Sequence, residues 1–121
     1  MHLEHVNLTV TDLDRSITFY RDLLDLEVRW KGPIDGERLG AHVGDDRCYL
    51  ALFQAVTDGA VDLDYSRPGV NHFGFVVDDL AEACRRLDHL GASVHREADY
   101  DPGRRVYFLD PDGHEVELVE Y

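Results

Sequence analysis

The sequence has little of what a disulfide framework, a zinc knot or a membrane span requires. It contains two cysteines, and Cys48 and Cys84 lie far apart without a CxxC spacing. Two isolated cysteines of this kind are typically buried, reduced thiols and not part of a disulfide framework or a zinc site. No apolar run approaches the ~20 residues that a transmembrane helix needs, and the first residues do not resemble a signal peptide. We therefore expect a cytoplasmic protein with no membrane partner.

Positive charge is also scarce. Lys31 is the only lysine, and 12 basic residues stand against 25 acidic ones, which gives a formal net charge of −13. Such a surface repels phosphate backbones, so we expect no nucleic-acid partner. The acidic excess is consistent with either adaptation to high salt or a GC-rich genome. The 121 residues, 44% of them hydrophobic, otherwise predict one ordinary globular domain, residues 1–121.

One pattern occurs twice in the chain. Residues 5–13 and 72–80 both alternate apolar and polar side chains and then become acidic, which predicts a strand that runs into a helix N-terminus. The second copy aligns His72 with His5. Helices are predicted over residues 12–25 and 79–90, because apolar side chains recur on one face of each. Strands are expected over residues 27–30, 38–43, 47–54, 93–97, 104–109 and 114–120.

Each half is therefore predicted to be a βαβββ unit in an α+β fold. Module one spans residues 1–54 and module two residues 70–121. Residues 55–69 are polar and are interrupted by glycine and proline, so they form the linker. A four-stranded sheet with one helix is too small to be stable until a second sheet pairs with it. The two curved, mixed sheets should then enclose a cleft between their concave faces.

Strand alternation places three metal-ligand side chains on the faces that line this cleft. His5 and His72 face away from the apolar side chains beside them, and Glu117 lies opposite Leu118. Two imidazoles and one carboxylate hold a divalent first-row metal and leave coordination positions open. A single strand histidine is more often a satisfied core or surface residue. The symmetry of the histidine pair favours the metal site.

Other candidate ligands are excluded by position. Glu115 also faces the cleft by alternation, but it follows the Gly113 turn closely and is expected to lie nearer solvent, so Glu117 is predicted to be the ligand. The remaining histidines share neither the alternation nor the repeat of the pair. They are interpreted as surface or turn residues: His2, His42, His89, His95 and His114.

These residues resemble the vicinal oxygen chelate superfamily, which includes glyoxalase I, fosfomycin-resistance thiol transferases, extradiol dioxygenases and bleomycin-resistance proteins. The resemblance covers the whole chain. It rests above all on residues 71–75, Asn-His-Phe-Gly-Phe, and on residues 107–117, Tyr-Phe-Leu-Asp-Pro-Asp-Gly-His-Glu-Val-Glu. It implies paired βαβββ modules that form an open, cup-like barrel.

The resemblance also implies the site and its partners. One divalent metal, Fe, Mn, Zn, Ni or Co, would bind His5, His72 and Glu117, and Tyr107 would lie near the substrate. Small two-module members of the superfamily often pair modules from different subunits. We therefore expect a homodimer, with the site formed either within one chain or across the dimer.

Departures from the superfamily's patterns narrow the choice of member. By the same resemblance, glyoxalase I takes a fourth ligand, a glutamate, from the last strand of its first module, where this chain has Tyr49, Ala51 and Phe53. Extradiol dioxygenases carry a further histidine shortly before the final hairpin, where this chain has Gly103-Arg104-Arg105. Fosfomycin transferases place phosphonate-binding basic residues after the glutamate, and residues 118–121 include none.

The leading hypothesis is a divalent-metal-dependent enzyme that binds an oxygenated small-molecule substrate by chelation and stabilises an enolate or oxyanion. Dioxygenase-like, lyase-like and thiol-transferase-like reactions all stay open. The aromatic side chains of Trp30, Tyr49, Phe53 and Tyr107 would supply a wall for the substrate. The alternative is a binding protein of the bleomycin-resistance type that sequesters a drug or metabolite in the same cleft. The intact ligand triad counts against that alternative.

Overall fold

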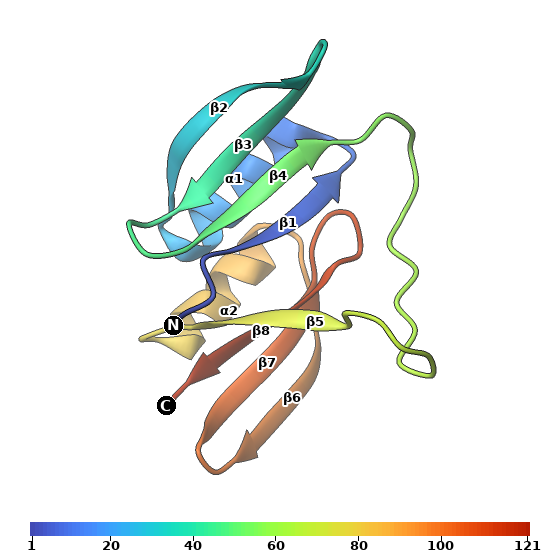
Figure 1. The fold of residues 1–121 in the computed structure, drawn as a ribbon. Coiled ribbons are helices and arrows are strands. Elements are labelled where there is room, and N and C mark those ends of the chain that lie inside the picture. The colour runs from blue at the N-terminus through green and yellow to red at the C-terminus, as the bar shows by residue number, and fades with distance from the viewer. The chain divides into compact units, whose positions relative to one another are not determined.

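The computed structural model describes residues 1–121, which divide into two compact units, Met1–Gly59 and Ala60–Tyr121. The division falls inside the segment predicted to be the linker. Each unit consists of one strand, one helix and three further strands (Figure 1). The predicted pair of βαβββ modules is therefore confirmed, whereas the pairing of their sheets into a barrel stays a prediction. Neither helix is long and apolar enough to cross a membrane.

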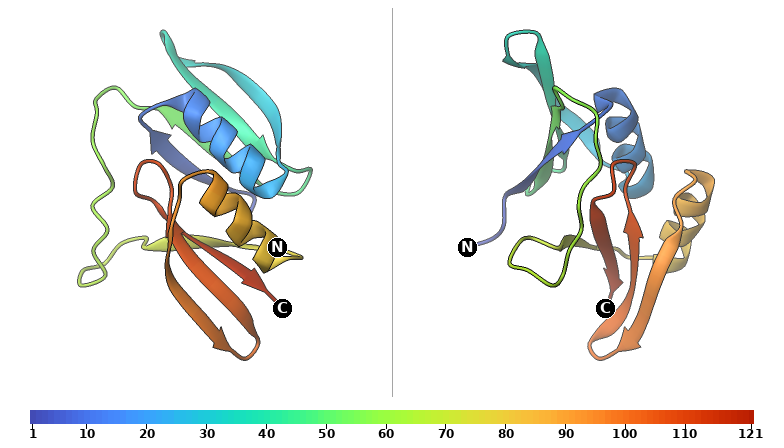
Figure 2. Two further views of the ribbon diagram at one scale, coloured as in Figure 1. Left: turned by 180° about the vertical axis from the view of Figure 1, so that it is seen from behind. Right: turned by 90° about the vertical axis from the view of Figure 1, so that its right-hand side faces the viewer.

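The first unit is a four-stranded mixed sheet with one helix on one face (Figure 2). Its strand order is β1-β4-β3-β2, in which β1 and β4 are parallel and the other pairs are antiparallel. The elements are β1 (His5–Val10), α1 (Leu13–Leu24), β2 (Glu27–Asp35), β3 (Arg38–Gly44) and β4 (Tyr49–Gln54).

The second unit repeats this arrangement. Its strand order is β5-β8-β7-β6, again with one parallel pair, β5 and β8, at one edge. The elements are β5 (His72–Val76), α2 (Leu80–His89), β6 (Val94–Tyr100), β7 (Gly103–Leu109) and β8 (Glu115–Glu120). Equivalent strands of the two units therefore occupy equivalent places in their sheets.

Both helices begin at an aspartate that caps the backbone. The Asp12 carboxylate accepts a hydrogen bond from the backbone N–H of Arg15, and the Asp79 carboxylate accepts one from that of Glu82. These bonds satisfy N–H groups that have no partner within the first turn of a helix. After α2, Gly91 adopts a positive φ of 78° that suits glycine at a helix end.

The apolar face of each helix packs on the buried face of its own sheet. Fully buried residues from both elements form the two cores, and each such side chain contributes about 1.5–3 kcal/mol on burial. In unit one they include Val10, Tyr20, Leu23, Leu50 and Leu52, and in unit two Leu80, Leu87, Phe108, Val116 and Leu118. Side chains between these positions along each strand point to the opposite face of the sheet.

The second strands of both modules are longer than predicted. The strand expected over residues 27–30 extends to Asp35, and the strand expected over residues 93–97 extends to Tyr100. Pro33 would interrupt a central strand, but β2 is at the edge of its sheet, where a missing N–H is tolerated. Each of these strands also contains an irregularity, after Val28 in β2 and after Val94 in β6.

The last hairpin has the turn that its sequence predicts. Gly113 adopts a positive φ of 92°, and the Asp110 carboxylate accepts hydrogen bonds from the backbone N–H groups of Asp112 and His114. The His114 ring also lies against this carboxylate, at 2.8 Å, so its interpretation as a turn residue fits its contacts. This turn fixes the register of β8, and with it the position of Glu117 opposite Tyr107.

A substitution at Gly44 tests the tight hairpin between β3 and β4. A Cβ at this position would overlap the carbonyl oxygen of Cys48 and would lie 2.5 Å from the Cα of Tyr49. Because both neighbours are backbone atoms, we expect Gly44→Ala to lower the free energy of unfolding by about 2 kcal/mol or more. Gly59→Ala, which has nothing within 4 Å of its new Cβ, is the control. Urea unfolding curves that are equal for the two variants would contradict this account.

Candidate metal centre

Module two brings two of the predicted ligands together on the face of its sheet opposite the core. His72 is on β5 and Glu117 on β8, which are adjacent parallel strands. The Nε2 atom of His72 is 3.2 Å from Oε2 of Glu117, and their side chains are 30% and 12% exposed. Gly74 pairs with Glu117 across these strands. The site is partly shielded from solvent but accessible.

The other polar atoms of both side chains are already engaged. His72 Nδ1 is 2.9 Å from the Tyr65 hydroxyl. Glu117 Oε1 accepts a hydrogen bond of 2.9 Å from Nη1 of Arg105. This leaves one imidazole nitrogen and one carboxylate oxygen facing each other. The lone pairs of two such atoms repel each other unless a proton or a cation lies between them. Imidazole nitrogen and carboxylate oxygen are also donor atoms that divalent first-row metals prefer. The residues present therefore fit a metal ion.

Tyr107 lies beside this pair. It is opposite Glu117 in the β7–β8 register, and its ring meets the His72 ring edge-on at 5.3 Å between centroids. Burial, the negative charge of Glu117 and a hydrogen bond to that carboxylate raise the pKa of the Tyr107 hydroxyl, although the nearby Arg96 opposes the shift. The hydroxyl therefore stays protonated at neutral pH and can act as a hydrogen-bond donor.

The expectation that Glu115 lies nearer solvent than Glu117 is wrong. Glu115 is only 5% exposed. Its Oε2 is 2.7 Å from Nε2 of His95, and its Oε1 accepts a hydrogen bond from the Tyr65 hydroxyl. Burial by itself would raise the pKa of Glu115, but these two hydrogen bonds and the charges of His95 and Arg96 outweigh it and lower the pKa. Glu115 is therefore an ionised carboxylate that is buried on the face of the sheet that carries His72.

The sequence does not predict that Tyr65 and His95 contact Glu115. Tyr65 lies in the irregular segment between the modules, where no periodicity indicates which way a side chain points. The sequence predicts a surface position for His95, and this prediction is incomplete because the His95 ring contacts the buried Glu115. The irregularity between Val94 and Arg96 lets both His95 and Arg96 reach this face. Simple alternation does not predict such a bulge.

Module one presents its histidine differently. The ring of His5 stacks on Tyr49 with 5.0 Å between centroids, and its Nδ1 is 3.5 Å from a carboxylate oxygen of Glu4. The registers of the two sheets make Ala51 the counterpart of Glu117, because each lies opposite the equivalent residue of its neighbouring strand. Module one therefore offers a histidine but no carboxylate at that position.

The structure brings together two of the three predicted ligands. His72 and Glu117 are in one unit, and His5 belongs to the other unit. No group of three or more His, Cys, Asp or Glu side chains in residues 1–121 is arranged to hold a metal ion. The complete set of three ligands stays a prediction.

Aromatic rings form a row across the same face of module one. The His42 ring is 4.4 Å from that of Tyr49 and 5.2 Å from that of Trp30, between centroids. The guanidinium of Arg29 lies 4.8 Å from the Tyr49 centroid. Burial, together with the positive charge of Arg29, lowers the pKa of His42. The face that carries His5 is therefore aromatic, as expected for Trp30 and Tyr49, with one cation above it.

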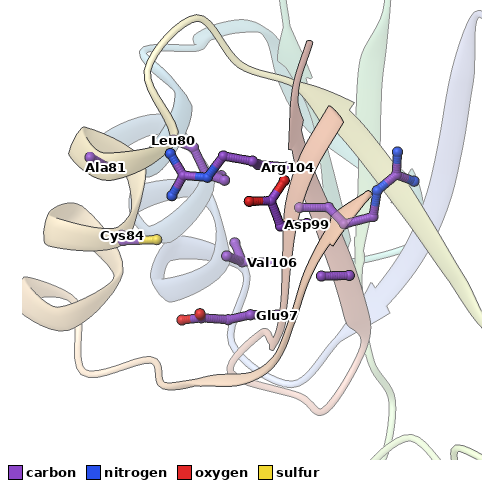
Figure 3. A pocket seen from close by; sticks show the side chains of 9 residues that line it. Leu80, Ala81, Cys84, Glu97, Asp99, Arg104 and Val106 are labelled. Atoms are coloured by element: carbon purple, nitrogen blue, oxygen red, sulfur yellow. The ribbon is translucent and has the colours of Figure 1, made fainter. Parts of the chain in front are cut away.

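A separate cavity of about 240 Å³ lies on the helix side of the sheet in module two (Figure 3). It is lined by Leu80, Ala81 and Cys84 of α2 and by residues of β6 and β7, among them Val106. Because successive strand residues alternate, Val106 faces this cavity and Tyr107 faces the candidate metal centre. The cavity therefore opens on the opposite side of the sheet from the centre, and Arg105, the partner of Glu117, is the residue that the two share.

Comparison with known proteins identifies relatives over nearly the whole chain. A family model described as the glyoxalase/bleomycin resistance protein/dioxygenase superfamily matches residues 2–118. A lactoylglutathione lyase of Salmonella typhimurium is 32% identical over 125 residues, which cover 99% of this chain and 93% of that protein. The glutathione transferase FosA of Serratia marcescens is 29% identical over 120 residues, which cover 96% and 78%.

Solved structures share the fold. A glyoxalase/bleomycin resistance protein/dioxygenase domain from Frankia is similar with a TM-score of 0.81 and 27% identity, over 99% of this chain and 91% of that one. A mutant fosfomycin resistance protein FosX from Listeria monocytogenes, solved with Mn(II) and 1S,2S-dihydroxypropylphosphonic acid, has a TM-score of 0.78 and 22% identity, over 98% and 90%. At that identity the second likeness concerns the fold alone.

The ion pair between Arg105 and Glu117 can be tested through stability. Both side chains are largely buried, at 13% and 12% exposed, so removing the guanidinium leaves a desolvated carboxylate without its cation. We expect Arg105→Met to lower the melting temperature by several degrees. Arg104→Met, an identical change at the exposed neighbouring position, should have little effect. Equal melting temperatures for the two variants would show that Glu117 does not depend on Arg105.

Proposed function

Because the chain belongs to the glyoxalase/bleomycin resistance protein/dioxygenase superfamily, we propose that it is a divalent-metal-dependent enzyme that binds an oxygenated small molecule by chelation. His5, His72 and Glu117 are the proposed ligands. A metal held by two imidazoles and one carboxylate would act as a Lewis acid toward a substrate oxygen. Fe, Mn, Zn, Ni and Co are the metals that this ligand set would take.

The observation that carries this proposal is the facing pair of donor atoms in module two. His72 Nε2 and Glu117 Oε2 lie 3.2 Å apart, while the second atom of each group is engaged by a neighbour, Tyr65 for the histidine and Arg105 for the glutamate. A pair of side chains fixed from behind in this way is preorganised for a metal ion. A solvated glutamate on a sheet surface would not need these contacts.

The residues around the pair suggest how the chain would assist a reaction. Tyr107 stays protonated and lies at the His72 ring, so it could donate a hydrogen bond to an oxygen atom that gains negative charge. Arg96 stacks on the Tyr107 ring at 3.8 Å from its centroid and adds positive charge on this face. We propose Tyr107 as the catalytic residue that contacts the substrate.

The substrate class follows from the donor set and from the relatives. Ala51 stands where module one would have to provide a carboxylate as a fourth metal ligand. The three proposed protein ligands therefore leave coordination positions for two substrate oxygens. The names of the two relatives described above concern glutathione chemistry, one as a lyase and one as a transferase. A lyase-like or thiol-transferase-like reaction is therefore the form of the proposal that the relatives support. The aromatic row with Trp30 and Tyr49 would line the substrate.

Metal affinity tests the proposed ligands. Glu117→Gln keeps the shape of the side chain but removes its charge, so we expect at least a ~10-fold loss of affinity for Mn²⁺ or Zn²⁺. Glu115→Gln is the matched control, since it makes the same change two residues away, and we expect it to be nearly silent. Calorimetric titration of the metal into each apo protein gives the comparison. The assignment fails if the control loses the metal and Glu117→Gln retains it.

The proposed homodimer is tested by mixing inactive variants. If module one of one subunit completes the site of module two in its partner, then His5→Ala and Glu117→Ala proteins should together regenerate about a quarter of the sites after subunit exchange. Metal content after repurification measures this recovery. Mixing His72→Ala with Glu117→Ala should restore none, because both changes are in module two. Sedimentation as a monomer at micromolar concentration would overturn the proposal.

A further inference from the structure

A chain of four polar side chains leads from the edge of module two to the candidate metal centre. His95 contacts Glu115 at 2.7 Å, the Tyr65 hydroxyl donates to Glu115 Oε1, and the same hydroxyl lies 2.9 Å from His72 Nδ1. Three of the four residues lie on separate strands, His95 on β6, Glu115 on β8 and His72 on β5. Tyr65 comes from the irregular segment before β5. The proposed metal set does not include Glu115, Tyr65 or His95.

The direction of these hydrogen bonds has a consequence for His72. A tyrosine hydroxyl has one proton, and the Tyr65 proton is given to Glu115. The Tyr65 oxygen must therefore accept a proton from His72 Nδ1 for the 2.9 Å contact to be a hydrogen bond. An imidazole that carries its proton on Nδ1 has its lone pair on Nε2. That is the atom that faces Glu117.

We infer that Glu115 and Tyr65 are positioning residues that fix the tautomer of His72, with the proton on Nδ1 and the lone pair of Nε2 directed at the metal position. This inference rests on the proposed function only for the use of that lone pair. Without Glu115, the Tyr65 hydroxyl would be free to turn and donate to Nδ1. His72 would then carry its proton on Nε2, where it blocks a metal and binds Glu117 instead.

The two carboxylates on β8 therefore have different tasks. Glu117 presents an oxygen to the metal position. Glu115 Oε1 is 3.6 Å from His72 Nδ1, which is too long for a hydrogen bond, so Glu115 acts through Tyr65 on the ring that supplies the nitrogen. Partners of this kind typically change metal affinity by about 10–100-fold when they are removed. The inference also explains why Glu115→Gln should be nearly silent: a glutamine retains an oxygen that can accept the Tyr65 proton.

Nitrogen-15 NMR of the histidine rings in the metal-free protein reads the tautomer directly. At a pH well above the range in which histidines ordinarily titrate, His72 should carry a proton on Nδ1 in the wild type and in Glu115→Gln. In Tyr65→Phe and Glu115→Leu it should change to the tautomer protonated only on Nε2. His72→Ala identifies the signal, and Tyr121→Phe is the control for loss of a tyrosine hydroxyl at an exposed site. The same His72 tautomer in the wild type and in Tyr65→Phe would overturn the inference.

Metal titration then separates this inference from the proposed function. Tyr65→Phe and Glu115→Leu should each weaken Zn²⁺ binding by about 10–100-fold, and the double variant should be no weaker than the singles, because both act through one ring. If the losses of Zn²⁺ affinity in the two single variants add up in the double variant, Glu115 does not act on His72 through Tyr65. If the wild type has the expected tautomer but binds no metal, the positioning of His72 stands and the proposed function falls. Thermal melts of each variant exclude loss of fold as the cause.

Discussion

The need of each sheet to bury one face under its own helix governs the rest of the structure. Leu118 and Val116 are buried in the core of module two, and strand alternation then forces Glu117 and Glu115 to the other face. The same rule turns His5 away from Val6 and Leu8 in module one. The positions of the polar side chains are thus a consequence of the apolar ones, and a shift of one residue in register would bury the carboxylates in the core.

The two modules share a register but differ in the side chains that they place on it. Where module two has Glu117, Glu115 and Tyr107, the strand pairings of module one place Ala51, Tyr49 and His42. Carboxylates on module two are therefore replaced by apolar and aromatic groups on module one. The repeat supplies equivalent positions, and divergence between the copies places carboxylates on one face and aromatic contacts on the other.

The sequence predicts the features that periodicity controls. The repeat, both helices, the final hairpin and the shared face of His72 and Glu117 follow from apolar spacing and turn residues. The burial of Glu115 could not be predicted, because it depends on Tyr65 from the irregular segment and on a bulge beside His95. Contacts that join elements distant in sequence through irregular backbone leave no periodic signal. The sequence predicts that the first edge strand ends at Trp30, whereas β2 continues through Pro33 to Asp35, because tolerance of proline depends on a strand's place in the sheet.

The proposed metal site requires both modules. Each module has one core beneath one sheet, and its other face carries polar and aromatic side chains that range from the buried Glu115 and Tyr107 to the exposed Trp30. In the proposed ligand set, module two provides His72 and Glu117, which can hold a metal only weakly on their own, and module one provides His5. A set divided in this way would make strong metal binding conditional on the presence of both modules. Under that proposal, each module would need its histidine, whereas one carboxylate would serve the whole site.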